Sequence, residues 1–396
     1  MIHSIARPLR SGLALAAVAV AGCVGVPPAP PAPQLPARYA PAAWDDLPGF
    51  AADRIREAWP ALIVGCRRLL AAPAKAGIWK QACDAAERVD ANDERAVREL
   101  LIAHFSPYRV AASDGTGEGL VTGYYEPTLP GSRVPDPRFP HPLYAAPADL
   151  VAIELASLHP ELADRRVRGR LDGRRVVPYW TRAEIESGSA PGLVPLAWAA
   201  DRMDAFFLEI QGSGRVALPD GSVMRIGYAD QNGHPYTPVA RVLIERGEMT
   251  REEASMQAIR TWGERNPARL PELLRENRSV VFFRELPPPA TGSVEAAIDG
   301  PPGSLGVPLA AGRAIAVDPR AIPLGAPVWL ATTHPLERTP LARLVLAQDT
   351  GGAIRGAVRA DLFWGAGSAA AEAAGRMKEP GRLWLLWPRG QPLPQS

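Results

Sequence analysis

The sequence lacks the patterns that bind metals, phosphates and nucleic acids. Its three cysteines have no metal-ligand spacing, its six histidines are scattered without pairing, and no Gly-x-x-x-x-Gly-Lys motif is present. Its charges are nearly balanced, with 44 Lys and Arg against 42 Asp and Glu. We therefore predict no metal, no cofactor and no nucleic-acid partner.

A hydrophobic run long enough to span a membrane is also missing from the N-terminus. The apolar segment 11–22 follows Arg7 and Arg10 and is too short for a spanning helix. This arrangement is typical of a secretory signal, which we assign to residues 1–22. The segment ends in "VAGC", which resembles a bacterial lipobox and predicts lipidation of Cys23. The alternative is an ordinary cleaved signal followed by an incidental cysteine.

A proline-rich stretch follows the predicted anchor. It holds seven prolines between positions 27 and 41, which is typical of a semi-rigid spacer. We assign residues 23–43 to the lipid anchor and linker. Val24 stands where an aspartate would retain many lipoproteins at the inner membrane. The predicted location is therefore the periplasmic face of the outer membrane, with the membrane contacted through Cys23.

The body of the chain begins with helices and then becomes rich in short strands. Apolar residues at three- and four-residue spacing predict helices over 44–105, and "GLVTGYYEP" at 119–127 predicts a strand. Residues 202–236 predict three strands joined by tight turns. A helix should follow, capped by Thr250 and Glu253.

Short apolar strands return after that helix and continue to the C-terminus. They begin with "SVVFFREL" at 279–286, and one small helix interrupts them in "GSAAAEAAGRM". Many short strands with glycine turns predict a small closed barrel. In an oxidising compartment, Cys66 and Cys83 form one disulfide or remain two buried thiols.

Six sequence blocks, in order, resemble the membrane-bound lytic murein transglycosylase A family. They are VTGYYEP, EIQGSGRVALPDGSVMRIGYADQNGHPY, MTREEASMQAIRTWGERNP, VFFRE, AVDPRAIPLGAPVWL and QDTGGAIRG…D…G. The resemblance covers the chain from about residue 66 to 387. It implies a mainly β fold with N-terminal helices, in which a double-psi β-barrel is interrupted by a smaller inserted β-barrel-like domain, with a substrate groove between them. The implied domains are 44–127 for the helices and first part of the barrel, 128–277 for the insert, and 278–390 for the rest of the barrel.

The resemblance also implies an activity and its site. Family members cleave the β-1,4 bond between N-acetylmuramic acid and N-acetylglucosamine in peptidoglycan and leave a 1,6-anhydro end. The family motif places the catalytic acid and base at Asp361, with Asp349 as the second carboxylate of the site. Asp318 is the third motif aspartate, with a site-supporting role or a turn as alternatives. For Asp361 to donate a proton, burial or a like charge must raise its pKa.

Glycan binding should use aromatic rings and polar groups near these aspartates. The adjacent Tyr124 and Tyr125 should face opposite sides of their strand, so that at most one lines a groove. Segment 211–214 could equally be a plain hairpin turn, and Gly351 and Gly352 a tight turn. The full set of expected substrate-binding residues is Tyr124, Tyr125, Gln211, Gly212, Ser213, Gly214, Tyr228, Asn232, Gln348, Thr350, Gly351, Gly352 and Trp364.

Other functions remain open at the level of the sequence. One is a murein hydrolase that uses both carboxylates with water. Another is a non-catalytic glycan-binding or wall-loosening lipoprotein, and a third is a structural tether between wall and membrane. Peptidoglycan strands are the expected partner in each case, and complexes with other cell-wall enzymes are a further expectation.

Overall fold

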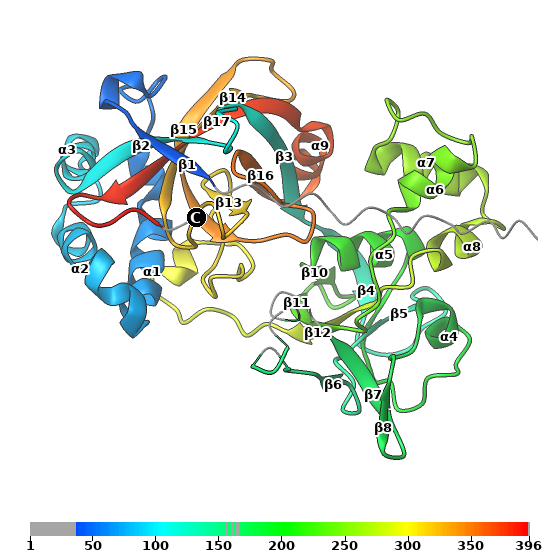
Figure 1. Ribbon diagram of the computed structural model, residues 1–396. Coiled ribbons are helices and arrows are strands. Elements are labelled where there is room, and N and C mark those ends of the chain that lie inside the picture. Colours follow the sequence, from blue (N-terminus) through cyan, green and yellow to red (C-terminus); the bar gives the residue numbers. More distant parts are fainter. Residues whose placement is uncertain (1–36, 156, 160–161, 163–166, 395–396) are drawn as a thin grey trace, which may run out of the picture. The chain divides into compact units, whose positions relative to one another are not determined.

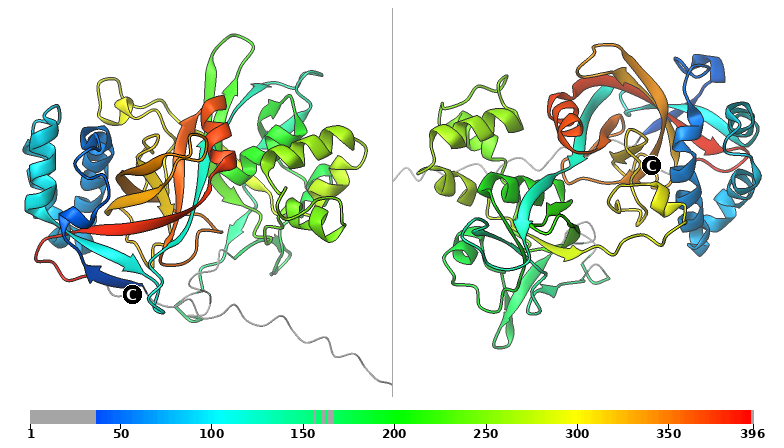
Figure 2. Two further views of the ribbon diagram at one scale, coloured as in Figure 1. Left: turned by 90° about the horizontal axis from the view of Figure 1, so that it is seen from above. Right: turned by 180° about the vertical axis from the view of Figure 1, so that it is seen from behind.

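The structure is a computed structural model in which residues 35–396 form one compact unit. It contains a β-barrel and an inserted β-domain, shown in Figure 1 and from two further directions in Figure 2. The predicted signal and Cys23 lie outside the described residues. Among the described residues, none of the helices combines the length and apolarity needed to cross a membrane. The described residues are 37–155, 157–159, 162 and 167–394.

Helices near the N-terminus pack on one side of the barrel, as the apolar spacing predicts. Asp93 caps the third α-helix by accepting hydrogen bonds from the backbone N–H groups of Arg95 and Ala96. Cys66 and Cys83 are joined in a disulfide between the first two α-helices, so the structure has the disulfide and not the two free thiols. These helices are η1 (Trp44–Asp46), η2 (Ile55–Ala58), α1 (Trp59–Leu70), α2 (Pro73–Arg88) and α3 (Glu94–His104).

Six strands close into the barrel. They are β3 (Gly119–Glu126), β13 (Ala314–Val317), β14 (Pro327–Thr333), β15 (Pro340–Asp349), β16 (Arg359–Ala366) and β17 (Lys378–Pro388). Around the ring, β3 pairs with β16, then come β13, β15, β14 and β17, and β17 pairs with β3 again. This ring confirms the predicted barrel, while the crossing pattern that would make it double-psi stays a prediction. The sheet continues beyond β17 into β2 (Phe105–Ala111) and β1 (Arg38–Pro41), and α9 (Ser368–Arg376) packs on β3 and β16.

The core of the barrel is continuous with the N-terminal helices. Leu346 on β15, Leu362 on β16 and Leu385 on β17 are completely buried in the same cluster as Trp59 and Leu62 of α1. Burying a side chain of this size stabilises the fold by roughly 1.5–3 kcal/mol. The strands that carry the motif aspartates are therefore held on a rigid frame.

The insert is built on a second sheet that runs in the order β12, β11, β10, β4, β9, β5. An isolated bridge between Ala145 and Phe283 links its two outer strands, which agrees with a barrel-like insert. Its strands are β4 (Thr128–Ser132), β5 (His141–Tyr144), β9 (Pro195–Ala199), β10 (Ser213–Ala217), β11 (Val223–Gln231) and β12 (Val281–Glu285), with a small sheet of β6 (Val151–Ala152), β7 (Arg168–Asp172) and β8 (Arg175–Val177). Its helices are α4 (Arg182–Glu186), α5 (Arg202–Gln211), α6 (Val239–Glu245), α7 (Met256–Arg265) and α8 (Leu270–Arg275).

The first of the three strands predicted in 202–236 is in fact helix α5. Asp201 caps it by accepting from the backbone N–H of Asp204, and Gly212 ends it with a positive φ of 79°. Phe206 packs on the helices α6 to α8, whereas Leu208 packs on the insert sheet. Because the helix buries two faces, its sequence lacks the single apolar stripe that would have identified it.

Two other predicted boundaries are wrong. The predicted barrel range 278–390 includes residues 278–286, but β12 pairs with β11 of the insert, so the insert continues at least to Glu285. The helix expected to begin at Thr250 begins later, at Met256, and Ser255 is its N-cap. Thr250 and Glu253 do bond to each other, but they close a turn.

The predicted C-terminal end of the linker is also wrong, because a strand begins before it. The range 23–43 includes β1, which pairs antiparallel with β2 at the edge of the barrel sheet. Proline at position 41 is tolerated there because an edge strand leaves backbone groups unpaired on one side.

A buried ionic cluster connects β3 of the barrel to the insert. Glu126, which is completely buried at the end of β3, accepts a hydrogen bond of 2.8 Å from Nε of Arg215 on β10. Arg225 on β11 lies 3.8 Å from the other oxygen of Glu126, and both arginines approach Asp299. The crossing from barrel to insert is therefore fixed by charges as well as by the chain itself.

Candidate active site

Asp361 lies on β16, where this strand runs parallel to β3 (Figure 1). In the register of the two strands Asp361 is opposite Thr122, whose hydroxyl donates a hydrogen bond of 2.6 Å to Oδ1 of Asp361. Arg359 donates from Nη2 to the same hydroxyl oxygen, at 2.9 Å. Arginine can only donate, so the single hydroxyl proton of Thr122 must point to Asp361. Within the described part of the chain, Oδ2 of Asp361 has no hydrogen-bond partner.

The surroundings of Asp361 favour its protonated form. Its pKa is raised from 3.8 to about 6, mainly by burial, and the nearby charge of Asp349 acts in the same direction. The hydrogen bond from Thr122 and the charge of Arg359 act in the opposite direction and only partly offset burial. Near neutral pH this carboxyl therefore exchanges its proton readily, as an acid and base must.

Asp349 ends β15 and accepts hydrogen bonds at both oxygens. Its Oδ2 accepts from the hydroxyl of Tyr124 at 3.0 Å. Its Oδ1 accepts from the backbone N–H and the hydroxyl of Ser304, at 2.9 and 2.7 Å, and from the backbone N–H of Thr350 at 2.8 Å. A carboxyl surrounded only by donors matches the acceptor-only, ionised form.

Tyr124 bonds to Asp349 and lies within electrostatic range of Asp361. Its ring packs on Phe363, with 5.2 Å between the ring centroids, and its hydroxyl reaches Asp349. Burial and the charges of Asp349 and Asp361 hold the pKa of Tyr124 well above its usual value. It therefore stays a neutral donor. Tyr125 faces away, as strand alternation predicts, and its pKa is raised by burial near Arg260 and Asp204 of the insert helices.

Three predicted substrate-binding residues have structural roles instead. Gln348 is completely buried and donates from Nε2 to the backbone oxygen of Ala61 on α1. Asn232 is 1% exposed and donates to the backbone oxygens of Trp180 and Arg278. These two assignments are wrong because neither side chain is accessible to a glycan.

Trp364 is the third, and strand alternation turns it away from Asp361. Its indole N–H donates to Met377, and its ring lies edge-on to His334. A Cβ on Gly123 would lie 2.7 Å from this indole, which shows how closely the tryptophan covers β3 from the side of α9.

The glycines in segment 211–214, after α5, have structural reasons. Gly212 ends the helix with a positive φ, which favours glycine, and a Cβ on Gly214 would lie 2.3 Å from Leu208, so only the second glycine is required for packing. Gln211 accepts from the backbone N–H of Tyr125 at 3.4 Å, which brings this segment beside β3. Glycan contacts of Gln211, Ser213 and the half-buried Tyr228 stay predictions.

The loop after Asp349 lies at the site, whereas the third motif aspartate has partners of its own. The hydroxyls of Thr350 and Ser304 lie 2.8 Å apart, and a Cβ on Gly352 would meet open space. A Cβ on Gly351 would lie 2.7 Å from Ile354. Asp318 is 3% exposed and bonds to Arg320 and to the backbone N–H of Gly356. These contacts agree with the supporting role predicted for Asp318.

Sequence reasoning missed Thr122, Ser304 and Arg359. Thr122 stands two positions before Tyr124 on one strand, so strand alternation could have placed both on the face of the aspartates. Arg359 likewise stands two positions before Asp361 on its strand. Ser304 comes from a distant loop, and no sequence signal relates it to Asp349.

Comparisons with known proteins agree with this geometry. The model of the MltA specific insert domain matches residues 120–284, and the 3D domain model matches residues 313–387. Membrane-bound lytic murein transglycosylase A of Escherichia coli K12 is 33% identical over 308 residues, covering 74% of this chain and 72% of the relative. The Vibrio cholerae protein of the same name is 32% identical over 293 residues, covering 70% of this chain and 68% of the relative.

Solved structures give the same result. The monoclinic crystal structure of MltA from Neisseria gonorrhoeae has a TM-score of 0.79 at 37% identity, covering 91% of this chain and 95% of that one. The membrane-bound lytic murein transglycosylase of Agrobacterium tumefaciens has a TM-score of 0.77 at 33% identity, with 89% and 98% covered. E. coli MltA with bound chitohexaose has a TM-score of 0.63 at 26% identity, with 88% and 94% covered.

Proposed function

The chain belongs to the family of membrane-bound lytic murein transglycosylases A, peptidoglycan-cleaving enzymes, and we propose that Asp361 acts in it as a single general acid and base. The observation that carries this proposal is the unequal environment of the two carboxyls. Asp361 has a pKa of about 6, while Asp349 accepts four hydrogen bonds. One can hold a proton near neutral pH and the other supplies a fixed negative charge.

In the first step Asp361 donates its proton to the bridging oxygen between N-acetylmuramic acid and N-acetylglucosamine. The bond from that oxygen to C1 of the muramic acid breaks, and the oxygen leaves as the 4-hydroxyl of N-acetylglucosamine. Positive charge develops at C1, and the negative charge of Asp349 stabilises it. Because Thr122 occupies Oδ1 of Asp361, Oδ2 is the oxygen that carries the proton.

In the second step Asp361, now a carboxylate, takes the proton of the muramic acid 6-hydroxyl. The 6-oxygen bonds to C1 and closes a 1,6-anhydro ring, and Asp361 is protonated again. No water is consumed. Tyr124 holds Asp349 in place throughout, because its hydroxyl donates to that carboxylate. The glycan strand would lie in a groove between barrel and insert, with Gln211 and Ser213 beside it.

The experiment that tests this is product analysis. Peptidoglycan sacculi are digested with the full chain in detergent, and the released muropeptides are analysed by mass spectrometry. Anhydro ends, lighter than reducing ends by one water, are expected. Reducing ends would show a two-carboxylate hydrolase instead, and binding to sacculi without release would show a non-catalytic wall protein.

The membrane attachment is proposed on sequence grounds. Relatives are membrane-bound by name, and the lipobox cysteine is the group in this chain that can carry acyl chains at the N-terminus. Labelled fatty acid should be incorporated into the full chain and not into Cys23→Ala. The labelled protein should fractionate with outer membranes, and equal labelling of both proteins would rule out this anchor. Association with other cell-wall enzymes stays a prediction.

A further inference from the structure

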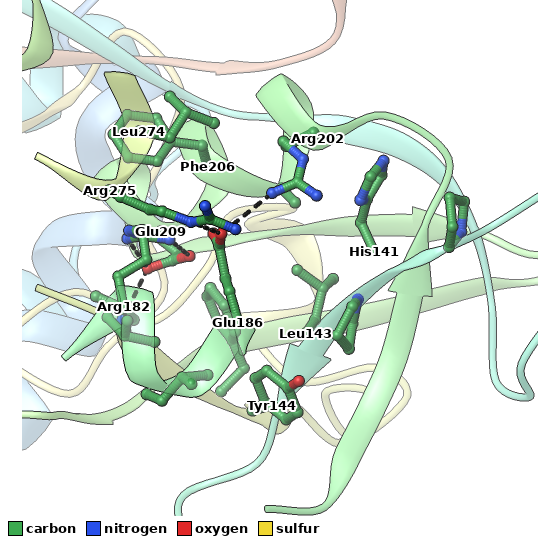
Figure 3. A pocket seen from close by; sticks show the side chains of 17 residues that line it. His141, Leu143, Tyr144, Arg182, Glu186, Arg202, Phe206, Glu209, Leu274 and Arg275 are labelled. Carbon is green, nitrogen blue, oxygen red and sulfur yellow. Dashed lines mark hydrogen bonds and ion pairs between the residues drawn. The ribbon is translucent and has the colours of Figure 1, made fainter. Parts of the chain in front are cut away.

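A cavity of about 230 Å³ lies in the insert, and all of its lining residues come from the insert (Figure 3). It is framed by β5, α4, α5, α8 and β12, and none of the barrel strands contributes to it. The cavity is smaller than the ~300–1,000 Å³ of sites for drug-sized ligands. It therefore suits the end of a chain better than a sugar ring system.

The first of two ionic groups in the lining is Arg182 with Glu209, whose charges cancel. Arg182 is almost fully buried and bonds through both Nη atoms to the two oxygens of Glu209, at 2.9 Å each. It also donates to the backbone oxygens of Asn277 and Ser279. This pair is neutral, and Arg182 donates four hydrogen bonds within the protein, so the pair forms a wall of the cavity and not a binding group.

The other ionic group carries excess positive charge. Arg202 and Arg275 both donate to the same oxygen of Glu186, at 3.3 and 2.9 Å, and Figure 3 shows the two guanidinium groups meeting there. Two arginines with one carboxylate leave a net charge of +1. His141 lies beside Arg202 and its pKa is lowered by burial and by that arginine, so it adds no charge at pH 7. Most N–H groups of both arginines have no partner among the described residues.

Apolar side chains form the rest of the lining. They include Leu143, Ile185, Phe206, Leu274, Val280 and Phe283. A net positive charge on an apolar floor fits a carboxylate on a small apolar body. A neutral sugar would leave the charge unpaired.

The distance from the cavity to Gln211, beside the proposed glycan groove, can be estimated from α5. Arg202 begins this helix and lines the cavity, whereas Gln211 ends it and bonds to Tyr125 beside the catalytic face of β3. Ten residues of helix span about 15 Å. An extended pentapeptide spans at most roughly 16–18 Å, which exceeds the length of α5. A peptide on a sugar beside Gln211 therefore reaches the cavity with its free end.

We propose that this cavity binds the carboxylate end of the peptide stem that muramic acid carries in peptidoglycan. Arg202 and Arg275 bind the carboxylate, and the apolar floor accepts the methyl groups of terminal alanine residues. This inference rests on the proposed function only for the identity of the polymer. In this proposal the insert binds the peptide, and the barrel cleaves the glycan.

The first test measures binding without any sugar. The probes are N-acetyl-D-alanyl-D-alanine and its C-terminal carboxamide, titrated calorimetrically into the detergent-solubilised full chain. The carboxylate should bind saturably, and the carboxamide roughly tenfold more weakly or not at all. Arg202→Gln and Arg275→Gln should each weaken carboxylate binding by a similar factor.

Arg246→Gln is the matched control, because Arg246 is also a half-buried arginine at a helix end of the insert and pairs with Glu272 and Glu276 away from the cavity. It should bind the probe like the wild type. The proposal is overturned if no saturable binding occurs, if the carboxamide binds equally well, or if Arg246→Gln weakens binding as much as Arg202→Gln.

The second test separates this inference from the proposed function. Cleavage is compared on sacculi with intact peptides and on glycan strands whose peptides an amidase has removed. Arg202→Gln should lower the ratio of the two rates by roughly tenfold, while Arg246→Gln leaves it unchanged. An unchanged ratio in Arg202→Gln overturns the peptide site. If the wild type cleaves neither substrate, the proposed function fails, and the binding test alone decides about the cavity.

Discussion

The carboxyl groups of the candidate site in the barrel and the carboxyl of Glu209 in the insert have different hydrogen-bond partners. On the barrel face, Asp361 and Asp349 accept hydrogen bonds from neutral hydroxyl groups such as those of Thr122 and Tyr124. In the insert, Glu209 is paired directly with Arg182 through two short ionic bonds. Burial lowers the pKa of Arg182, but the charge and hydrogen bonds of Glu209 outweigh this and leave it raised.

The difference separates a carboxyl that reacts from one that holds the fold together. A direct arginine partner favours the ionised form of a carboxyl group and so opposes its use as an acid. At Asp361 the nearest cation, Arg359, acts through the hydroxyl of Thr122, so its effect is too weak to offset burial. The third motif aspartate, Asp318, follows the pattern of the insert, because Arg320 bonds to it directly.

The largest expected effect comes from removing the reactive carboxyl of the barrel. Asp361→Asn keeps an acceptor for Thr122 but cannot transfer a proton, so turnover should fall by about 10²–10⁴-fold. Muropeptide release by chromatography measures this, and a sedimentation assay should show that binding to sacculi is retained. Asp220→Asn, an exposed turn aspartate of the insert, is the control. Turnover of Asp361→Asn within a few-fold of the wild type would contradict the assigned role.

Breaking an ionic pair of the insert should affect stability instead. Glu209→Gln leaves Arg182 buried without a counter-charge and should destabilise the fold by about 3–5 kcal/mol. Denaturant unfolding followed by circular dichroism measures it. Glu99→Gln, which breaks an exposed pair with Arg95, should change stability by less than about 1 kcal/mol. Equal effects of the two substitutions would show that the insert pair contributes no more to the free energy of unfolding than the exposed pair.

The same substitution at two motif aspartates should change stability in opposite directions. Asp318 has a lowered pKa, because bonds from Arg320 and Gly356 outweigh burial. Its stabilising contribution is present above the ordinary pKa of 3.8 and is lost as the pH falls through the lower folded value. Asp318→Asn should therefore destabilise the protein at pH 7, by on the order of 1–3 kcal/mol.

Asp361 has a pKa raised from 3.8 to about 6. The unfolded chain ionises first, so the wild type loses stability as the pH rises from about 4 to 6. Asp361→Asn should therefore raise the melting temperature at pH 7 and leave it nearly unchanged at pH 4. Thermal unfolding of both variants at the two pH values checks these signs. A lower melting temperature for Asp361→Asn at pH 7 would argue against a strained, buried carboxyl.

The smallest effect should follow from Thr122→Val. The hydrogen bond from Thr122 lowers the pKa of Asp361, so its loss raises that pKa further. Cleavage needs the protonated acid and declines as the pH rises through about 6, so the alkaline limb of the pH–rate profile should move to higher pH. The maximal rate should change by no more than roughly tenfold. In Thr332→Val, whose hydroxyl bonds to the backbone oxygen of Pro380, the limb should stay in place.

Local sequence patterns predicted most elements of the fold and missed those whose partners are distant. Periodic apolar spacing identified α1 to α3, and short apolar runs identified β13 to β17. The helix α5 was mistaken for a strand because it buries two faces. The sequence predicts the strand β12 but places it in the barrel. Its pairing with β11 of the insert depends on tertiary contacts that local sequence patterns do not contain.

The residues of the site were also predicted only in part. Motif resemblance selected Asp361, Asp349 and Tyr124, which the structure brings together. It also selected Gln348 and Asn232, whose amide groups satisfy buried backbone oxygens. A polar residue in a motif has the same letter whether it faces a substrate or a buried carbonyl. Burial alone distinguishes the two roles.

By itself, the sequence determined the secretory signal pattern, the strand-rich barrel, the family and the aspartate expected to act. Each of these depends on local periodicity or on residue identity, which the sequence states directly. The tertiary structure decided that Thr122 lies between Arg359 and Asp361, that Ser304 holds Asp349, and that Arg202 and Arg275 share Glu186. These decisions involve residues far apart in the chain, and proton affinity and charge excess depend on which groups folding brings within hydrogen-bond distance.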